Sequence, residues 1–120
     1  MLIRNGMELN DYFIVSDASI TDAMLKIEKN GNRGIMVINN NNQVIGVATD
    51  GDIRKSLIRG VLPNTLLKDI INTNFKFIDR SPEFTLAERV RKIFDLYSEL
   101  EIVPIVDDSM KLLSVATRRN

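Results

Sequence analysis

Two stretches of the chain share one alternation of apolar and polar positions. Residues 35–49 (IMVINNNNQVIGVAT) and 103–117 (VPIVDDSMKLLSVAT) align without a gap, and both end in Val-Ala-Thr. Every apolar position of one is apolar in the other, except that Met110 replaces Asn42. Each stretch is an apolar run, a cluster of Asn, Asp or Ser, and a second apolar run. This order predicts a β-hairpin with a polar turn in each half of the chain.

A helix pattern precedes each hairpin. Residues 19–27 align with residues 85–93, and the first of these carries Ile20, Met24 and Ile27 on one helical face. Each stretch opens with a Ser/Thr-x-x-acid sequence, which is typical of a capping box at a helix start. The segment between helix and hairpin is longer in the second half, so we expect a two-residue insertion around residues 97–101.

The remaining elements complete two similar units. A further helix is expected over residues 50–59, a short helical turn over 66–71, and strands over 12–15 and 75–78. The pattern predicts an α/β fold with two β-α-β-β-α units: residues 8–62, a linker over 63–74, and residues 75–120, whose closing helix is missing. Each unit is of a size that is marginal for an isolated fold, so its uncovered apolar face must be buried against the other unit or another chain, and we expect a shared core and a homodimer.

Composition removes several classes of function. Sixteen basic residues balance sixteen acidic ones, which argues against a broad nucleic-acid-binding face. The chain has no Cys and no His, which removes thiol nucleophiles, disulfides and zinc sites. It also lacks an apolar run long enough to cross a membrane and a signal-peptide pattern at its start. We therefore expect a soluble, cytoplasmic protein without membrane or nucleic-acid partners and without a metal site.

The most informative chemistry lies where the first hairpin runs into the helix at residue 50. Gly46 suits close approach by a ligand or by another backbone segment. Thr49 offers a hydroxyl, and Asp52 offers a carboxylate that suits the two hydroxyls of a ribose. Amides at a helix start favour phosphate, with Arg54 and Arg33 as positive candidates. A simpler interpretation is that Thr49 and Asp52 only cap the helix.

The same signature recurs at the end of the chain. Thr117 and Asn120 match Thr49 and Asp52 in the alignment. No helix would follow for Thr117 to cap if Asn120 were the last residue. Continuation of the chain explains this signature better than capping does.

Each half-repeat ends in the pattern Gly-hydrophobic-x-Thr-x-x-Asp or a variant of it. In this respect the chain resembles a tandem pair of cystathionine-β-synthase-type (CBS) domains, also called a Bateman module. The segments that carry the resemblance are DASITDA at residue 17, VIGVATDGDIR at residue 44 and IVPIVDD at residue 102. The resemblance covers residues 8–120. It implies a pseudo-twofold pair of units that often dimerises, with clefts that bind adenosine nucleotides and control an attached catalytic or transport domain.

The resemblance also implies a ligand site in each half. The first site would use Thr49 and Asp52 for the ribose and Arg54 for phosphate, with Gly46 nearby. Its base pocket would be lined by the strand entry at Arg33, Gly34 and Ile35. The second site would use the corresponding residues Thr117, Asn120, Ile102 and Val103. The second half departs from the pattern. Ser114 replaces Gly, Asn120 replaces Asp, and Glu101 stands where Arg33 stood. A carboxylate there opposes phosphate unless Arg118 or Arg119 compensates, so we expect a weaker or empty second site.

These features predict a regulatory, non-catalytic module that senses AMP, ADP or ATP. The phrase TDGDIRK followed by LIRG is similar to CBS pairs attached to bacterial sugar-phosphate nucleotidyltransferases or sugar-phosphate isomerases. The Met1 start and the abrupt end favour the nucleotidyltransferases. No glycine-rich nucleotidyl-transfer loop is present, so catalysis would lie in an attached domain. The alternative is a structural dimerisation module with a vestigial ligand site.

Overall fold

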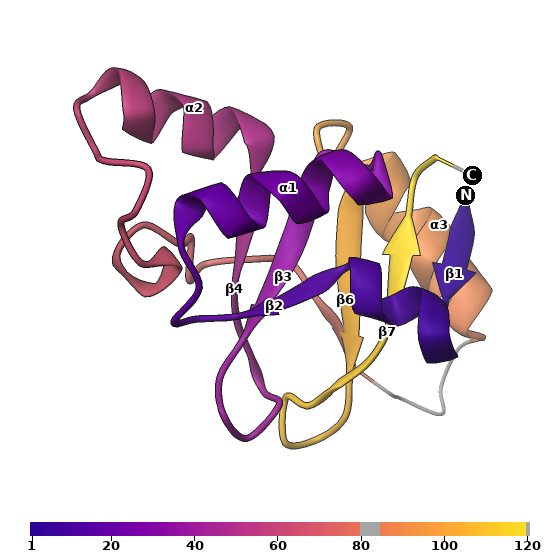
Figure 1. The fold of residues 1–120 in the computed structure, drawn as a ribbon. Coiled ribbons are helices and arrows are strands. Elements are labelled where there is room, and N and C mark those ends of the chain that lie inside the picture. The colour runs from indigo at the N-terminus through magenta and orange to yellow at the C-terminus, as the bar shows by residue number, and fades with distance from the viewer. Residues whose placement is uncertain (80–84, 120) are drawn as a thin grey trace.

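The chain folds into two β-sheets with helices on their outer sides (Figure 1). A computed structural model describes residues 1–79 and 85–119. The first sheet has the order β2-β3-β4, with β2 at Phe13–Val15, β3 at Gly34–Ile38 and β4 at Val44–Thr49. The second has the order β1-β7-β6-β5, with β1 at Leu2–Arg4, β5 at Ile78–Asp79, β6 at Ile102–Val106 and β7 at Leu112–Thr117. The α-helices are α1 (Ile20–Asn30), α2 (Asp50–Ile58) and α3 (Leu86–Leu96), and short 3-10 helices span Gly6–Asp11 (η1) and Leu67–Asp69 (η2).

The two halves share one topology, which confirms the predicted α/β fold class and its internal repeat. In each half the first strand pairs in parallel with the second, and the second pairs antiparallel with the third. The ladder of each hairpin is interrupted at the same aligned place, between Val37 and Ile38 and between Ile105 and Val106. The described residues after β7 form no helix, whereas α2 follows β4 in the first half.

The hairpin turns are alike and meet each other. Asn39 Oδ1 accepts hydrogen bonds from two amides of its own turn, and Asp107 Oδ1 does the same in the second half. Asn42 and Met110 both have positive φ angles, of 62° and 67°. Met110 therefore keeps the turn conformation that Asn favours. The tips pair through the Val44 amide, which donates to the Met110 carbonyl at 2.8 Å, and lie together in Figure 1.

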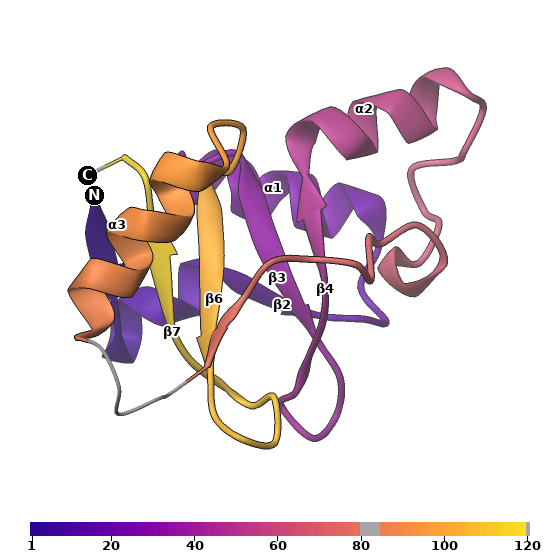
Figure 2. The ribbon, with the colours of Figure 1, turned by 180° about the vertical axis from the view of Figure 1, so that it is seen from behind.

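Strand β3 shows why both halves are needed for one core. Ile35 and Val37 pack with residues of α1, while Met36 and Ile38 belong to clusters that contain residues of β6 or β7. Strand β6 repeats this alternation, and its Val103 and Ile105 pack with α3. Helix α1 lies in front of the sheets in Figure 1, and α3 lies in front in the reverse view of Figure 2. Each half thus buries one face under its own helix and the other against its partner half.

The helix starts follow the sequence signals. The Ser19 hydroxyl accepts from the Asp22 amide, and the Asp22 carboxylate accepts from the Ser19 amide, which is the predicted capping box. Thr85 caps α3 by accepting from the Glu88 amide at 3.4 Å. Residues 97–101 separate α3 from β6, two more than the residues 31–33 between α1 and β3, as predicted.

The N-terminal strand and the linker each pair with the edge of a sheet, which was not predicted. Strand β1 joins the edge of β7, with Arg4 opposite Val115. In the linker, Asn72 exchanges two backbone hydrogen bonds with Val47 of β4. Because Val47 aligns with Val115, Asn72 and Arg4 occupy equivalent edge positions in the two halves. Strand β5 begins at Ile78, so only the last residue of the strand expected over residues 75–78 belongs to it, and that boundary was wrong.

Candidate ligand cleft between the two halves

A cleft of about 230 Å³ lies where the two halves meet. The first half contributes residues before and within β3, the end of β4 and the start of α2. The second half contributes the segment between α3 and β6. The lining residues are Arg33, Gly34, Val47, Thr49, Asp50, Gly51, Glu99, Leu100, Glu101 and Ile102.

Thr49 presents the one hydroxyl of this lining. Its oxygen accepts from the Asp52 amide at 3.1 Å, so the capping interpretation of the Thr-x-x-Asp sequence is confirmed. That bond uses an oxygen lone pair and leaves the hydroxyl hydrogen available to donate. Capping and ligand contact are therefore compatible at this residue.

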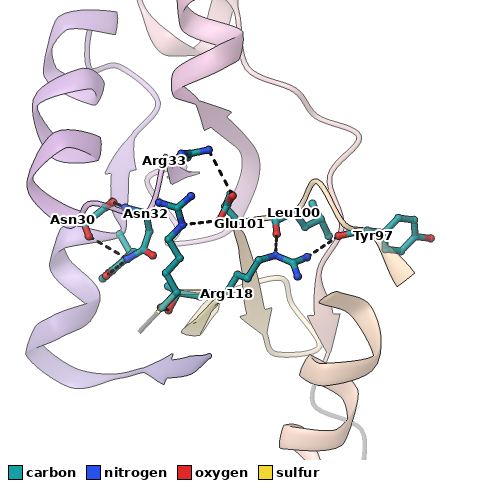
Figure 3. Close-up of polar contacts among 10 residues, drawn as sticks. Asn30, Asn32, Arg33, Tyr97, Leu100, Glu101 and Arg118 are labelled. Atoms are coloured by element: carbon teal, nitrogen blue, oxygen red, sulfur yellow. Dashed lines mark hydrogen bonds and ion pairs between the residues drawn. The ribbon is translucent and has the colours of Figure 1, made fainter. Parts of the chain in front are cut away.

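Arg33 and Glu101 bring charge to the cleft from opposite halves (Figure 3). Arg33 has a positive φ of 66°, a conformation that a non-glycine residue adopts at a cost. Its carbonyl accepts from the Asp50 amide at 3.0 Å, which ties the strand entry to the start of α2. Its guanidinium lies 3.9 Å from Glu101 Oε1.

Glu101 is held between two arginines. Its other carboxylate oxygen, Oε2, lies 3.6 Å from Arg119 Nε, which is an ion-pair distance longer than a hydrogen bond. This oxygen is buried and accepts no hydrogen bond from the described residues. A buried acceptor of this kind has room for a donor from a water molecule or a ligand. The acidic groups of the lining, Asp50, Glu99 and Glu101, outnumber its single cation, Arg33.

Arg118 is not free to serve the cleft. Its guanidinium donates to the carbonyls of Leu100 and Tyr97 at 2.7 and 2.9 Å (Figure 3). It also donates to the Phe94 carbonyl at 2.9 Å and lies over the Phe94 ring. These carbonyls belong to the end of α3 and the segment after it, so Arg118 acts as a C-terminal cap. Of the two arginines considered for Glu101, Arg119 supplies the ion pair.

Four predicted site residues line the cleft: Arg33, Gly34, Thr49 and Ile102. Ile102 lies beside Gly34, where an added Cβ would be 2.9 Å from the Ile102 side chain, so Gly34 is needed for the close approach of β3 and β6. The expectation placed Ile102 in the second site instead.

The other predicted residues of the first site lie outside this lining. Ile35 is fully buried in the core under α1. Gly46 faces the linker, because an added Cβ would be 2.8 Å from Ile71 Cδ1 and 3.1 Å from the Asn72 carbonyl oxygen. Of the two partners expected for Gly46, the structure thus places another backbone segment there. Asp52 and Arg54 are exposed on α2, with an Arg54 nitrogen 3.8 Å from where a Cβ of Gly51 would be.

The second predicted site is closed by the chain itself. Thr117 and Val103 have no exposed surface. The Thr117 hydroxyl donates to the Arg119 carbonyl at 2.7 Å and accepts from Arg4 Nε at 3.3 Å. Asn120 lies outside the described residues.

Sequence reasoning missed the contribution of the insertion after α3. Glu99 and Leu100 line the cleft from this segment, and neither was a candidate. The two extra residues were visible in the alignment of the halves, and an insertion at a strand entry is the signal that could have found them.

The described residues contain no group of three potential metal-ligating side chains. None of the helices within the described ranges has the length and apolarity of a membrane span.

Known proteins share the fold of this chain. The CBS domain family model matches residues 7–59. A CBS-domain structure of a transcriptional regulator from Streptococcus pneumoniae superposes with a TM-score of 0.74 at 24% identity, covering 98% of this chain and 90% of that one. The chain has the fold of a CBS domain pair.

Two further solved structures that resemble this chain contain adenosine compounds. The pair of protein MJ0100, solved with 5-methylthioadenosine and S-adenosyl-L-methionine, gives a TM-score of 0.69 at 21% identity, covering 88% of this chain and 80% of that one. CBSX2, solved with AMP, gives 0.67 at 21% identity, covering 89% and 81%.

Two curated relatives are enzymes that contain similar segments. Inosine-5'-monophosphate dehydrogenase of Nitrosopumilus maritimus is 26% identical over 92% of this chain and 21% of its own length. Arabinose 5-phosphate isomerase GutQ of Shigella flexneri is 30% identical over 79% of this chain and 28% of its own length. The chain thus spans between a fifth and a third of these relatives. Neither is a nucleotidyltransferase, so the expected association with nucleotidyltransferases gains no support from them.

Proposed function

We propose that this CBS pair is a regulatory module that binds an adenosine ligand in the cleft between its halves. The observation that carries the proposal is the placement of the Thr49 hydroxyl, the Arg33 guanidinium and the buried Glu101 oxygen around one cleft. A hydroxyl and an acceptor suit the donors and acceptors of a ribose or a purine. The adenosine compounds held by MJ0100 and CBSX2 support this ligand class.

The regulatory effect follows from the position of the cleft. Residues of both halves line it, so a ligand that contacts both stabilises one relative arrangement of the halves. An attached domain that responds to this arrangement is then coupled to ligand binding, with a typical coupling of about 1–3 kcal/mol. The relatives make a sugar-phosphate isomerase or a nucleotide-oxidising dehydrogenase a better supported attached domain than a nucleotidyltransferase.

Thermal unfolding with and without AMP tests the proposal. Thr49→Val removes the cleft hydroxyl and the cap of α2, while Thr85→Val removes an equivalent cap of α3 away from the cleft. Each lost cap is expected to lower the free energy of unfolding by about 1 kcal/mol. AMP raises the Tm of the wild type and of Thr85→Val, and fails to raise that of Thr49→Val. An unchanged Tm of the wild type with AMP, ATP and 5-methylthioadenosine would contradict the proposal.

A dimerisation role has one supporting observation of its own. Met24 and Leu25 of α1 and Ile58 of α2 are exposed apolar side chains, and Leu25 is 61% exposed. Met24 and Leu25 line a groove that also includes Asp50 at the start of α2. We expect this face to pair with a second copy of the chain. Light scattering should give a dimer mass for the wild type and a monomer mass for Leu25→Glu, and a wild-type monomer would contradict this role.

A further inference from the structure

We propose that Arg4 is an internal occupant of the second ligand site, so that each chain offers one open cleft instead of two. The inference rests on the proposed function, because it takes the open cleft to be a ligand site. Its structural part, the closure of the second site by β1, stands on contacts within the chain.

The second half repeats the elements that form the open cleft. Val115 and Thr117 align with Val47 and Thr49, and Asn32 aligns with Leu100. Val47, Thr49 and Leu100 line the open cleft, none of them fully buried. Their counterparts are 0%, 0% and 4% exposed. The same place is thus open in one half and filled in the other.

Arg4 and Tyr12 fill it. The Arg4 side chain is 13% exposed, donates to the Thr117 hydroxyl and lies 5.3 Å from the centre of the Tyr12 ring. Tyr12 packs with Ile102 and Val115, and its hydroxyl accepts from Asn32 Nδ2 at 2.9 Å. Arg4 therefore occupies the Thr117 hydroxyl, and the Tyr12 ring covers the apolar side chains of Ile102 and Val115.

The first half differs at both of these positions. Asn72 occupies the edge position of Arg4, and its side chain accepts from the Asn74 amide in its own turn. By the strand register, Lys76 corresponds to Tyr12, and its ammonium lies 4.6 Å from the Tyr97 ring instead. Both side chains are occupied elsewhere, and the Thr49 hydroxyl keeps its access to the cleft.

The chain has no cysteine, so single thiols report access to each site directly. Thr49→Cys and Thr117→Cys place one thiol in each half, and a thiol reagent then measures its exposure. We expect Thr49→Cys to react at least about ten-fold faster than Thr117→Cys, because a buried thiol reacts only through local opening. Adding Arg4→Asn, the residue of the open half, should raise the Thr117→Cys rate by about ten-fold and leave the Thr49→Cys rate unchanged.

Arg91→Asn, an exposed arginine on α3, is the matched control and should change neither rate. Arg4→Ala also removes the long side chain, and should open the site in the same way if Arg4→Asn does not fold. Equal reaction rates at the two thiols in the parent background, or a thiol at 117 that stays protected in both Arg4 variants, would overturn the closure.

Calorimetric titration with AMP separates this inference from the proposed function. The expected stoichiometry is one AMP per wild-type chain and two per Arg4→Asn chain. Two AMP per wild-type chain overturns the inference and supports the proposed function. Absence of AMP binding to both proteins, together with an opened Thr117→Cys, contradicts the proposed function and leaves the closure by Arg4 supported.

Discussion

Replacement of Gly46 by Ala tests whether this glycine serves the fold or a ligand. The backbone of Gly46 is not in the left-handed region, so the substitution acts only through the added Cβ. That atom would lie 2.8 Å from Ile71 Cδ1 and 3.1 Å from the Asn72 carbonyl oxygen. The Ile71 methyl group can rotate away, but the carbonyl belongs to a backbone segment that is held to Val47 by two hydrogen bonds of 3.2 and 3.3 Å.

The expected effect is a loss of stability. Overpacking of this kind costs about 1–3 kcal/mol, which corresponds to a Tm decrease of roughly 4–12 °C for a chain of this size. Thermal unfolding followed by circular dichroism measures it. Gly51→Ala is the matched control, because its Cβ meets nothing closer than 3.8 Å and Ala is the better helix former. We expect the control to be as stable as the wild type or more stable.

Three results would refute this reasoning. An unchanged Tm for Gly46→Ala would mean that the linker does not pack against β4 as described. A Tm decrease that Ile71→Val fully reverses in the double variant would place the clash on the Ile71 side chain and not on the Asn72 carbonyl. Loss of the AMP response without any loss of stability would assign Gly46 to ligand binding.

The remaining predictions concern three charged side chains at or near the cleft, Arg118, Arg119 and Glu101. Arg118→Met should lower the free energy of unfolding by about 2–4 kcal/mol, because three carbonyls lose a charged donor. Arg119→Met removes only a partly exposed ion pair, and should lower the free energy of unfolding by less than about 1 kcal/mol. Denaturant unfolding measures both variants, and equal effects would contradict the capping role of Arg118. Glu101→Gln removes a negative charge from an acidic cleft, so calorimetry should show ATP binding strengthened relative to 5-methylthioadenosine, with Asp108→Asn in the hairpin turn as the control. An unchanged ratio of the two affinities would show that Glu101 does not act on ligand charge.

The repeat, the hairpins, the capped helices and therefore the fold class could be predicted from the amino-acid pattern alone. These features depend on local chemistry: the spacing of apolar positions, the oxygen of a turn Asn or Asp, and the hydroxyl of a capping Ser or Thr. Each of these acts within a few residues, so each can be recognised before any tertiary contact is known. The Thr49 cap is a local property of this kind, and so is the Thr-x-x-Asp pattern that made Thr49 a candidate site residue.

Only the tertiary structure decided which of the two candidate sites is open. Arg4 and Thr117 lie near opposite ends of the chain, and no local pattern indicates that β1 pairs with β7. The placement of Gly46 under the linker and the use of Arg118 as a helix cap have the same origin. A glycine or an arginine carries the same local signal whether a ligand or the chain itself occupies the space beside it, and packing between distant segments determines which one does.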